Sequence, residues 1–95
     1  MNNSKYKALD VKNRCENKLH INFKSGKECN GWFIYNKRKV ARITVPHGRK
    51  NIPQKTYLSM ANQLKLSVDD FDRFLDCPLK EDEYIRILKK QISNL

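Results

Sequence analysis

The fold is decided between residues 19 and 45, which read LHINFKSGKECNGWFIYNKRKVARITV. This stretch holds three short segments rich in β-branched and aromatic residues, which is the composition of β-strands. The predicted strands are residues 19–24, residues 31–36 and residues 40–45. Residues 25–27 (SGK) are typical of a hairpin turn, and residues 36–39 form a polar connection. Because both connections are short, we expect an antiparallel meander that ends before Pro46.

Alternation of apolar and polar side chains predicts the faces of the first and third strands. In the first strand the apolar side chains share one face and the polar ones share the other. In the third strand Ile43 and Val45 are expected to point into the core. Arg42 and Thr44 then point outward from the same strand.

The sequence does not decide which side chains of the second strand are buried, because its residues are apolar or aromatic on both faces. In one arrangement Trp32 and Ile34 are buried. Phe33 and Tyr35 then lie beside Arg42 on the outer face. In the other arrangement the exposed pair is reversed. Both arrangements leave an aromatic ring near an arginine.

Helical periodicity flanks the predicted sheet on both sides. Residues 5–20 are weakly amphipathic and predict a first helix. Two further helices have apolar stripes and are expected to begin after Thr56 and after Ser67 as N-caps, the second ending before Pro78. A last helix is expected from Glu81, with acids in its first turn and lysines near its end, which match the helix dipole.

This order of elements favours an α+β fold, a two-layer sandwich in which helices cover one face of a three-stranded antiparallel sheet. With 95 residues and 11.3 kDa, the chain is long enough for one hydrophobic core but not for two. We therefore expect a single domain over residues 1–95, with a core of residues 5–66 and a C-terminal helical extension of residues 67–95. The other face of the sheet has no predicted cover.

Charge is unevenly distributed along the chain. The sequence has 20 Lys and Arg against 10 Asp and Glu, a net charge of +10. Residues 1–55 hold 14 of the bases and 3 of the acids, whereas residues 56–95 hold 6 bases and 7 acids. Such an excess is typical of a surface that meets phosphate groups or an acidic protein. No apolar run of membrane-spanning length and no signal-peptide pattern occurs, so we expect a cytoplasmic protein without membrane contact.

A basic and aromatic surface is the main functional signal in the sequence. Cations bracket the strand that carries Arg42, both in the connection before it and in the segment after Pro46. Ring faces stack on unpaired bases, while guanidinium and ammonium groups meet phosphates. The candidate nucleic-acid-binding residues are Trp32, Phe33, Tyr35, Lys37, Arg38, Lys39, Arg42, Arg49, Lys50 and Lys55.

Residues 43–66, ITVPHGRKNIPQKTYLSMANQLKL, resemble the C-terminal part of the HicA family of toxin ribonucleases. In that family a strand ending in T-V-P-H is followed by G-K and then by a helix with the pattern P-x-G-T-L-x-S-I-L-K-Q. The matching positions here are Thr44, Val45, Pro46, His47, Gly48, Lys50, Pro53, Thr56, Ser59 and Gln63. The resemblance lies within a looser span of residues 30–74. It implies a fold similar to the double-stranded-RNA-binding domain, RNA as the substrate class and an antitoxin as partner.

One departure from the family pattern bears on activity. HicA enzymes carry a G-S-H signature at the start of the second strand, and its histidine is implicated in RNA cleavage. The equivalent position here is Trp32, and an indole N–H cannot act as a general base. Lys55 also replaces the family's glycine before the helix. The sequence therefore favours a protein that is not an enzyme.

Other chemistries have weaker signals. The three cysteines are Cys15, Cys29 and Cys77. They contain no C-x-x-C pair, and one stays unpaired in any disulfide scheme, so we expect reduced thiols. His47, after the third strand, is the one weak candidate for a relocated general base, and His20 is expected to be structural. The acids of residues 69–76 lie on one predicted helix, so we expect no metal site and no cofactor.

These observations favour a non-catalytic RNA-binding protein, although charge alone does not distinguish RNA from DNA. Two alternatives stay open. One is a HicA-like ribonuclease whose general base has moved to His47. The other is a protein-interaction module of the toxin–antitoxin kind, which binds an acidic protein or forms a homodimer through the uncovered sheet face. In that case the aromatic residues lie in the interface or beneath the helices.

Overall fold

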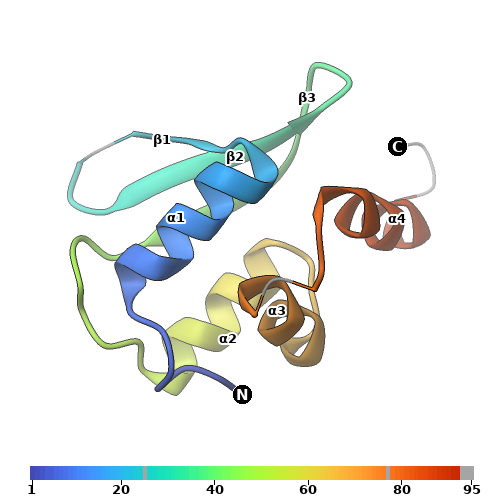
Figure 1. Ribbon diagram of the computed structural model, residues 1–95. Coiled ribbons are helices and arrows are strands. Elements are labelled where there is room, and N and C mark those ends of the chain that lie inside the picture. The colour runs from blue at the N-terminus through green and yellow to red at the C-terminus, as the bar shows by residue number, and fades with distance from the viewer. Residues whose placement is uncertain (25, 77, 93–95) are drawn as a thin grey trace.

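The computed structural model describes residues 1–24, 26–76 and 78–92. The elements follow the predicted order of one helix, three strands and further helices (Figure 1). They are α1 (Ala8–Leu19), β1 (Asn22–Lys24), β2 (Cys29–Tyr35), β3 (Arg38–Val45), α2 (Gln54–Gln63), α3 (Val68–Leu75) and α4 (Glu81–Gln91). The predicted α+β class is therefore confirmed.

The sheet is antiparallel with the strand order β1-β2-β3, as the predicted meander requires. β1 is shorter than predicted because α1 continues to Leu19, and His20 then ends the helix with a left-handed φ of 56°. β3 is longer than predicted and begins at Arg38. The turn before it consists of Asn36 and Lys37, whose φ angles of 52° and 63° are those of a type I′ turn. That turn matches the twist of the strands, so pairing continues up to it.

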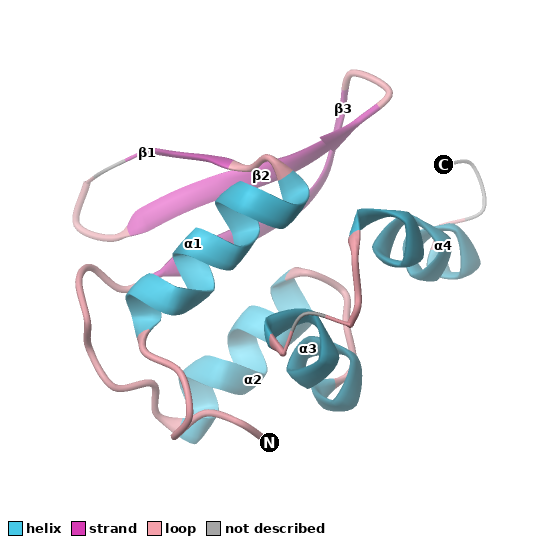
Figure 2. Cartoon of the chain, viewed as in Figure 1, coloured by secondary structure: helices cyan, strands magenta, loops and turns pink. Residues whose placement is uncertain are grey.

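The helices lie on one side of the sheet, and Figure 2 shows the strands as the upper layer with the helices beneath. The strands turn alternate side chains toward the helices. These side chains include Cys29 and Phe33 from β2 and Ala41, Ile43 and Val45 from β3, and they pack with Val11, Tyr57, Met60 and Leu64 of the α1 and α2 region. Burial of this apolar surface is the main favourable contribution to folding. In the described residues, no helix covers the opposite face of the sheet.

The two predicted N-caps have different outcomes. The Ser67 side chain accepts a hydrogen bond from the backbone N–H of Asp70 at 3.1 Å, which confirms Ser67 as the cap of α3. Thr56 is not a cap, because α2 begins two residues earlier and Pro53 is its N-cap. The proline ring holds φ at −62°, and the Pro53 carbonyl accepts the N–H of Tyr57 at 2.9 Å. The start of α2 is therefore set by the backbone.

The helices after residue 66 share one hydrophobic core with the sheet. Five side chains of α3 and α4 are fully buried: Phe71, Phe74, Leu75, Tyr84 and Leu88. The Tyr84 ring meets the Phe33 ring edge-on, with 4.9 Å between centroids, and its hydroxyl donates to the Leu64 carbonyl at 2.9 Å. These contacts hold α4 against the sheet and the end of α2. The described residues of the predicted C-terminal extension thus supply part of the core.

Polar contacts fasten the N-terminal segment to α3. Lys5 Nζ lies 2.8 Å from a carboxylate oxygen of Asp76, and the Tyr6 hydroxyl donates to the same carboxylate. The Tyr57 hydroxyl of α2 donates to Asp72 in a similar way. Burial is the main reason why the pKa of Tyr57 is raised, so its hydroxyl stays protonated as a donor.

Cys15 and Cys29 are buried free thiols. Burial raises the pKa of the Cys15 thiol, which keeps it protonated and unreactive. Cys77, and Ser25 of the predicted turn, lie outside the described residues.

In the part of the chain that the structure describes, no helix combines the length and apolarity needed to cross a bilayer.

Candidate nucleic-acid interface

Packing of β2 decides the strand phase that the sequence leaves open. Phe33 is 2% exposed, whereas Trp32 is 39% exposed and Ile34 is 58% exposed. The Phe33 ring packs against Tyr84, so its side of the strand is the one that the helices cover. The candidate role of Phe33 in base stacking is therefore wrong, because a ring enclosed in the core does not reach a base.

The side chains opposite Phe33 form a solvent-exposed surface, which we call the open face. It consists of Asn22 and Lys24 of β1, Asn30, Trp32 and Ile34 of β2, and Lys39, Arg42 and Thr44 of β3. Pairing of the strands places Trp32 between Asn22 and Arg42, so that three side chains form a row across the sheet. The expected outward direction of Arg42 and Thr44 is confirmed.

A β-bulge brings Lys39 onto the open face. Phe33 pairs with Ala41. The next residue of β2, Ile34, pairs with Lys39, two positions from Ala41, so β3 contains one extra residue. Strict alternation would have turned Lys39 toward the helices. Instead its Nζ lies 5.3 Å from the centroid of the Trp32 ring, a cation–π contact that contributes about 0.5–1 kcal/mol at an exposed site.

Hydrogen bonds organise the neighbouring part of the open face. Arg42 Nη2 donates to Asn30 Oδ1 at 3.1 Å, and the Thr44 hydroxyl donates to the same oxygen at 2.7 Å. The guanidinium is thereby oriented while its other N–H groups stay available to a ligand. At the edge of β3 the Thr44 N–H donates to Gln63 Oε1 at 2.9 Å, so this backbone group is not available to a further strand.

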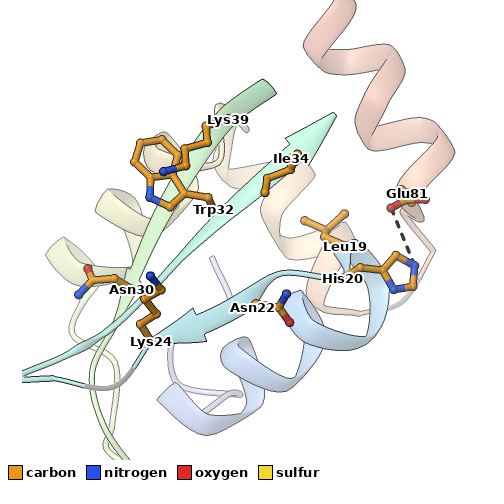
Figure 3. A pocket seen from close by; sticks show the side chains of 9 residues that line it. All are labelled: Leu19, His20, Asn22, Lys24, Asn30, Trp32, Ile34, Lys39 and Glu81. Atoms are coloured by element: carbon orange, nitrogen blue, oxygen red, sulfur yellow. Dashed lines mark ion pairs between the residues drawn. The ribbon is translucent and has the colours of Figure 1, made fainter. Parts of the chain in front are cut away.

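A pocket of about 400 Å³ lies on the open face, between the sheet and the start of α4 (Figure 3). Its lining residues are Leu19, His20, Asn22, Lys24, Asn30, Trp32, Ile34, Lys39 and Glu81. Figure 3 shows Trp32 and Lys39 on one side and His20 and Glu81 on the other. His20 Nε2 lies 4.0 Å from Glu81 Oε2. The volume is at the lower end of the ~300–1,000 Å³ found for small-ligand pockets.

The remaining candidate residues lie around the open face. Tyr35 is half-buried on the helix side, where Lys89 Nζ lies 5.6 Å from its ring centroid. The remaining candidate cations are exposed: Lys37 and Arg38 at the β2–β3 turn, Arg49 and Lys50 in the loop after β3, and Lys55 in the first turn of α2. The turn and the loop lie at opposite ends of the eight-residue β3, about 25 Å apart. The structure therefore gathers only Trp32, Lys39 and Arg42 of the candidates.

The ion pairs found among the described residues lie in the helical layer, and several cations around the sheet take part in none of them. Residues 17–68 contain eleven Lys and Arg and one acid, Glu28. In the helical layer Arg73 pairs with Asp70 and Glu83, at 3.2 and 2.6 Å. The following cations form no ion pair with another residue of the described chain: Lys24, Lys37, Lys39, Arg42, Arg49, Lys50 and Lys55. The sheet surface is therefore electrostatically suited to a polyanion.

His47 has a structural environment. Its Nε2 lies 2.6 Å from the Gly26 carbonyl oxygen and its Nδ1 lies 3.4 Å from Cys29 Sγ. In the neutral ring, Nε2–H donates to the carbonyl and Nδ1 accepts from the thiol. Both ring nitrogens are thus engaged, and His47 links the end of β3 to the β1–β2 connection. This geometry argues against His47 as a general base.

Several pocket residues were not among the candidates from the sequence: Asn22, Lys24, Asn30, Ile34, His20 and Glu81. Alternation in residues 19–24 was a usable signal, because it places His20, Asn22 and Lys24 on one face. Nothing local in the sequence indicates Glu81, which is 61 positions from His20.

Among the described residues, no group of three or more His, Cys, Asp and Glu side chains is arranged to hold a metal ion.

Comparison of the chain with protein-family models, with curated proteins and with solved structures found no match. The first five elements have the helix–three strands–helix order that the HicA resemblance implies, but that order also occurs without any such relationship. Any function must therefore be argued from the open face itself.

Proposed function

We propose that the protein binds RNA through the open face of its sheet. The observation that carries the proposal is an exposed tryptophan set among cations without ion pairs, on a sheet face that no helix of the described chain covers. Trp32 lies beside Lys39 and across from Arg42, and the strand residues of the open face include no carboxylate, Glu81 lying at the opposite side of the pocket. Stacking of a base on an aromatic ring contributes about 1–3 kcal/mol, and the neighbouring cations meet the phosphates of the same strand.

Salt dependence tests the proposal. The logarithm of the affinity of a single strand falls with the logarithm of salt concentration by about 0.7 for each neutralised phosphate. If Lys24, Lys39 and Arg42 each meet one phosphate, the slope is roughly −2. A larger slope would indicate that the loop cations, such as Arg49 and Lys50, also take part. Fluorescence anisotropy of labelled RNA at several salt concentrations gives this slope.

A matched pair of variants separates the open face from net charge. The double variant Lys39→Ala and Arg42→Ala should reduce the slope to roughly −0.7, because two phosphate contacts are lost. The control is Arg86→Ala with Lys90→Ala, which removes two exposed cations of α4 and lowers the net charge equally. The control should bind as the unaltered protein does. Equal losses in both variants would mean that only total charge matters, and absence of binding would remove the proposal.

One observation favours a second function, RNA cleavage. His20 and Glu81 both line the pocket that contains Trp32, and His20 Nε2 lies 4.0 Å from Glu81 Oε2. This separation is longer than a hydrogen bond, so one of the two side chains must shift before the carboxylate can orient the ring of a general base. His20 is therefore a better placed candidate than His47. Cleavage of a labelled RNA should be lost in His20→Ala and retained in His47→Ala, and absence of cleavage by the unaltered protein would reject this function.

Charge argues against a homodimer through the open face. Two copies would bring Lys39 and Arg42 of each together without acids to neutralise them. Repulsion of this kind does not arise with an acidic protein, which would compete with RNA for the same surface. Light scattering tests the homodimer, since a mass of twice 11.3 kDa in solution would contradict this charge argument.

A further inference from the structure

We infer that the pocket on the open face receives one unpaired nucleobase, so that the bound RNA is single-stranded where it meets the sheet. This inference rests on the proposed RNA binding and adds the class of RNA. A nucleobase has an aromatic face and polar edges, and it is joined to phosphates on both sides. The pocket offers a partner for each of these three features.

The aromatic face is matched by the apolar wall of the pocket. Trp32 supplies a ring, and Ile34 and Leu19 continue the apolar surface beside it. Lys39 Nζ lies over this ring, 5.3 Å from its centroid. A stacked base is a stronger partner for an indole than an exposed ammonium group is. The base therefore displaces Lys39, whose flexible side chain then meets an adjacent phosphate.

The polar edge is matched by Asn22. This residue is exposed, lies opposite Trp32 in the strand register and lines the pocket. Its side-chain amide makes no hydrogen bond to another described residue, so it can both donate to and accept from a base edge. The Asn30 amide oxygen, in contrast, is already occupied by Arg42 and Thr44. Asn22 is therefore the amide of the pocket whose donor and acceptor are both available to a base edge.

A duplex does not fit this pocket. In an A-form helix each base is stacked on both sides and paired along its edge, and the major groove is too narrow for side chains. Its phosphates are still accessible to loop cations such as Arg49 and Lys50. Duplex RNA should therefore bind through charge alone, without contact between a base and Trp32.

Fluorescence of Trp32 reports directly on the pocket, because it is the only tryptophan in the chain. The probes are short oligoadenylate, short oligouridylate, the duplex formed from the two, and inorganic polyphosphate. Binding of each is followed separately by anisotropy of a labelled strand or by competition with it. We expect the single strands to quench Trp32 emission, and the duplex and polyphosphate to bind without comparable quenching.

Variants test the same point through affinity. Trp32→Ala should weaken binding of the single strands by about 5- to 150-fold and change binding of the duplex little. Asn22→Ala should reduce the difference in affinity between oligoadenylate and oligouridylate. The control is Leu58→Ala on α2, because Leu58 is also 39% exposed but lies outside the open face. It should bind every probe as the unaltered protein does, and circular dichroism verifies that each variant is folded.

The outcomes separate this inference from the proposed function. Quenching by the single strands alone supports the base pocket. Binding of RNA without quenching, or with quenching by polyphosphate to the same extent, would overturn the base pocket and leave RNA binding in place. Failure of every RNA to bind would overturn both.

Discussion

The two faces of the sheet are built from the same strands and have opposite chemistry. On the helix side Phe33 and its neighbours are sealed in the core, while one position away Trp32 lies in solvent among cations. Adjacent aromatic residues therefore have different roles: Phe33 stabilises the fold, and Trp32 is available to a ligand. Because successive side chains of a strand point to opposite faces, substitutions can separate stability from binding.

The largest expected effect is that of Phe33→Ala. Removing a buried ring leaves a cavity beside Tyr84, and we expect the free energy of unfolding to fall by about 3–5 kcal/mol. Trp32→Ala, on the open face, should cost no more than about 1 kcal/mol, since its ring is already partly in water. Urea denaturation measures both values. Similar losses for the two variants would contradict the assignment of the faces.

Gly31→Ala tests how closely β1 packs against the helix side of β2. A Cβ at this position would lie 2.4 Å from Cγ2 of Ile21 and 3.0 Å from a ring carbon of Phe23. We expect a loss of about 1–3 kcal/mol from overpacking. Gly26→Ala is the matched control, because its nearest atom would be 3.8 Å away, and a change within about 0.5 kcal/mol is expected. A Gly31 variant as stable as the control would show that β1 moves aside readily.

Arg42→Ala should leave stability almost unchanged and alter binding. Its side chain is exposed, and its one hydrogen bond within the described residues is to Asn30, so the free energy of unfolding should change by no more than about 0.5 kcal/mol. The salt slope of RNA binding should decrease by about 0.7, because one phosphate contact is lost. Denaturation and anisotropy on the same preparation give both numbers. An unfolded variant would mean that the open face also supports the fold.

The smallest expected change in the free energy of unfolding comes from the contacts of Lys5 and Tyr6 with Asp76. The hydrogen bond from Lys5, followed by that from Tyr6, lowers the pKa of Asp76 below its usual 3.8. The stabilising contribution is thus present above that pH and is lost as pH falls through the lowered value. Asp76→Asn should flatten the dependence of unfolding free energy on pH below about pH 4. Lys5→Met should flatten it in the same way, and an unchanged acid profile in both variants would contradict the contact.

Sequence patterns were sufficient to predict an element and its buried face where the two sides of that element differ in polarity. The meander, the stripes of α2 and α3 and the outward direction of Arg42 all follow from spacing alone, because apolar periodicity reports which face is buried. The Ser67 cap follows from a local hydrogen bond. The predicted Thr56 cap was wrong, because the start of α2 depends on the fixed φ of Pro53. Local rules thus succeed when one local contact decides the outcome.

The candidate site was only partly predictable. Trp32, Lys39 and Arg42 were identified by residue type, but nothing in the run from Trp32 to Tyr35 could assign its phase, since both faces are apolar. Lys39 reaches the open face because of a bulge, which is a property of strand pairing. His20 and Glu81 meet only because α4 is held against the sheet by Tyr84. These features depend on contacts between distant segments.

What the sequence by itself determined is the α+β class, the antiparallel meander and the concentration of positive charge around it. These properties depend on composition and on short-range periodicity, which the amino-acid sequence contains directly. Only the tertiary structure decided that Trp32 rather than Phe33 faces solvent, that Lys39 lies over its ring and that a pocket forms beside them. The physical reason is that the helices can bury just one face of the sheet, and which face they bury depends on how side chains from the whole chain pack together.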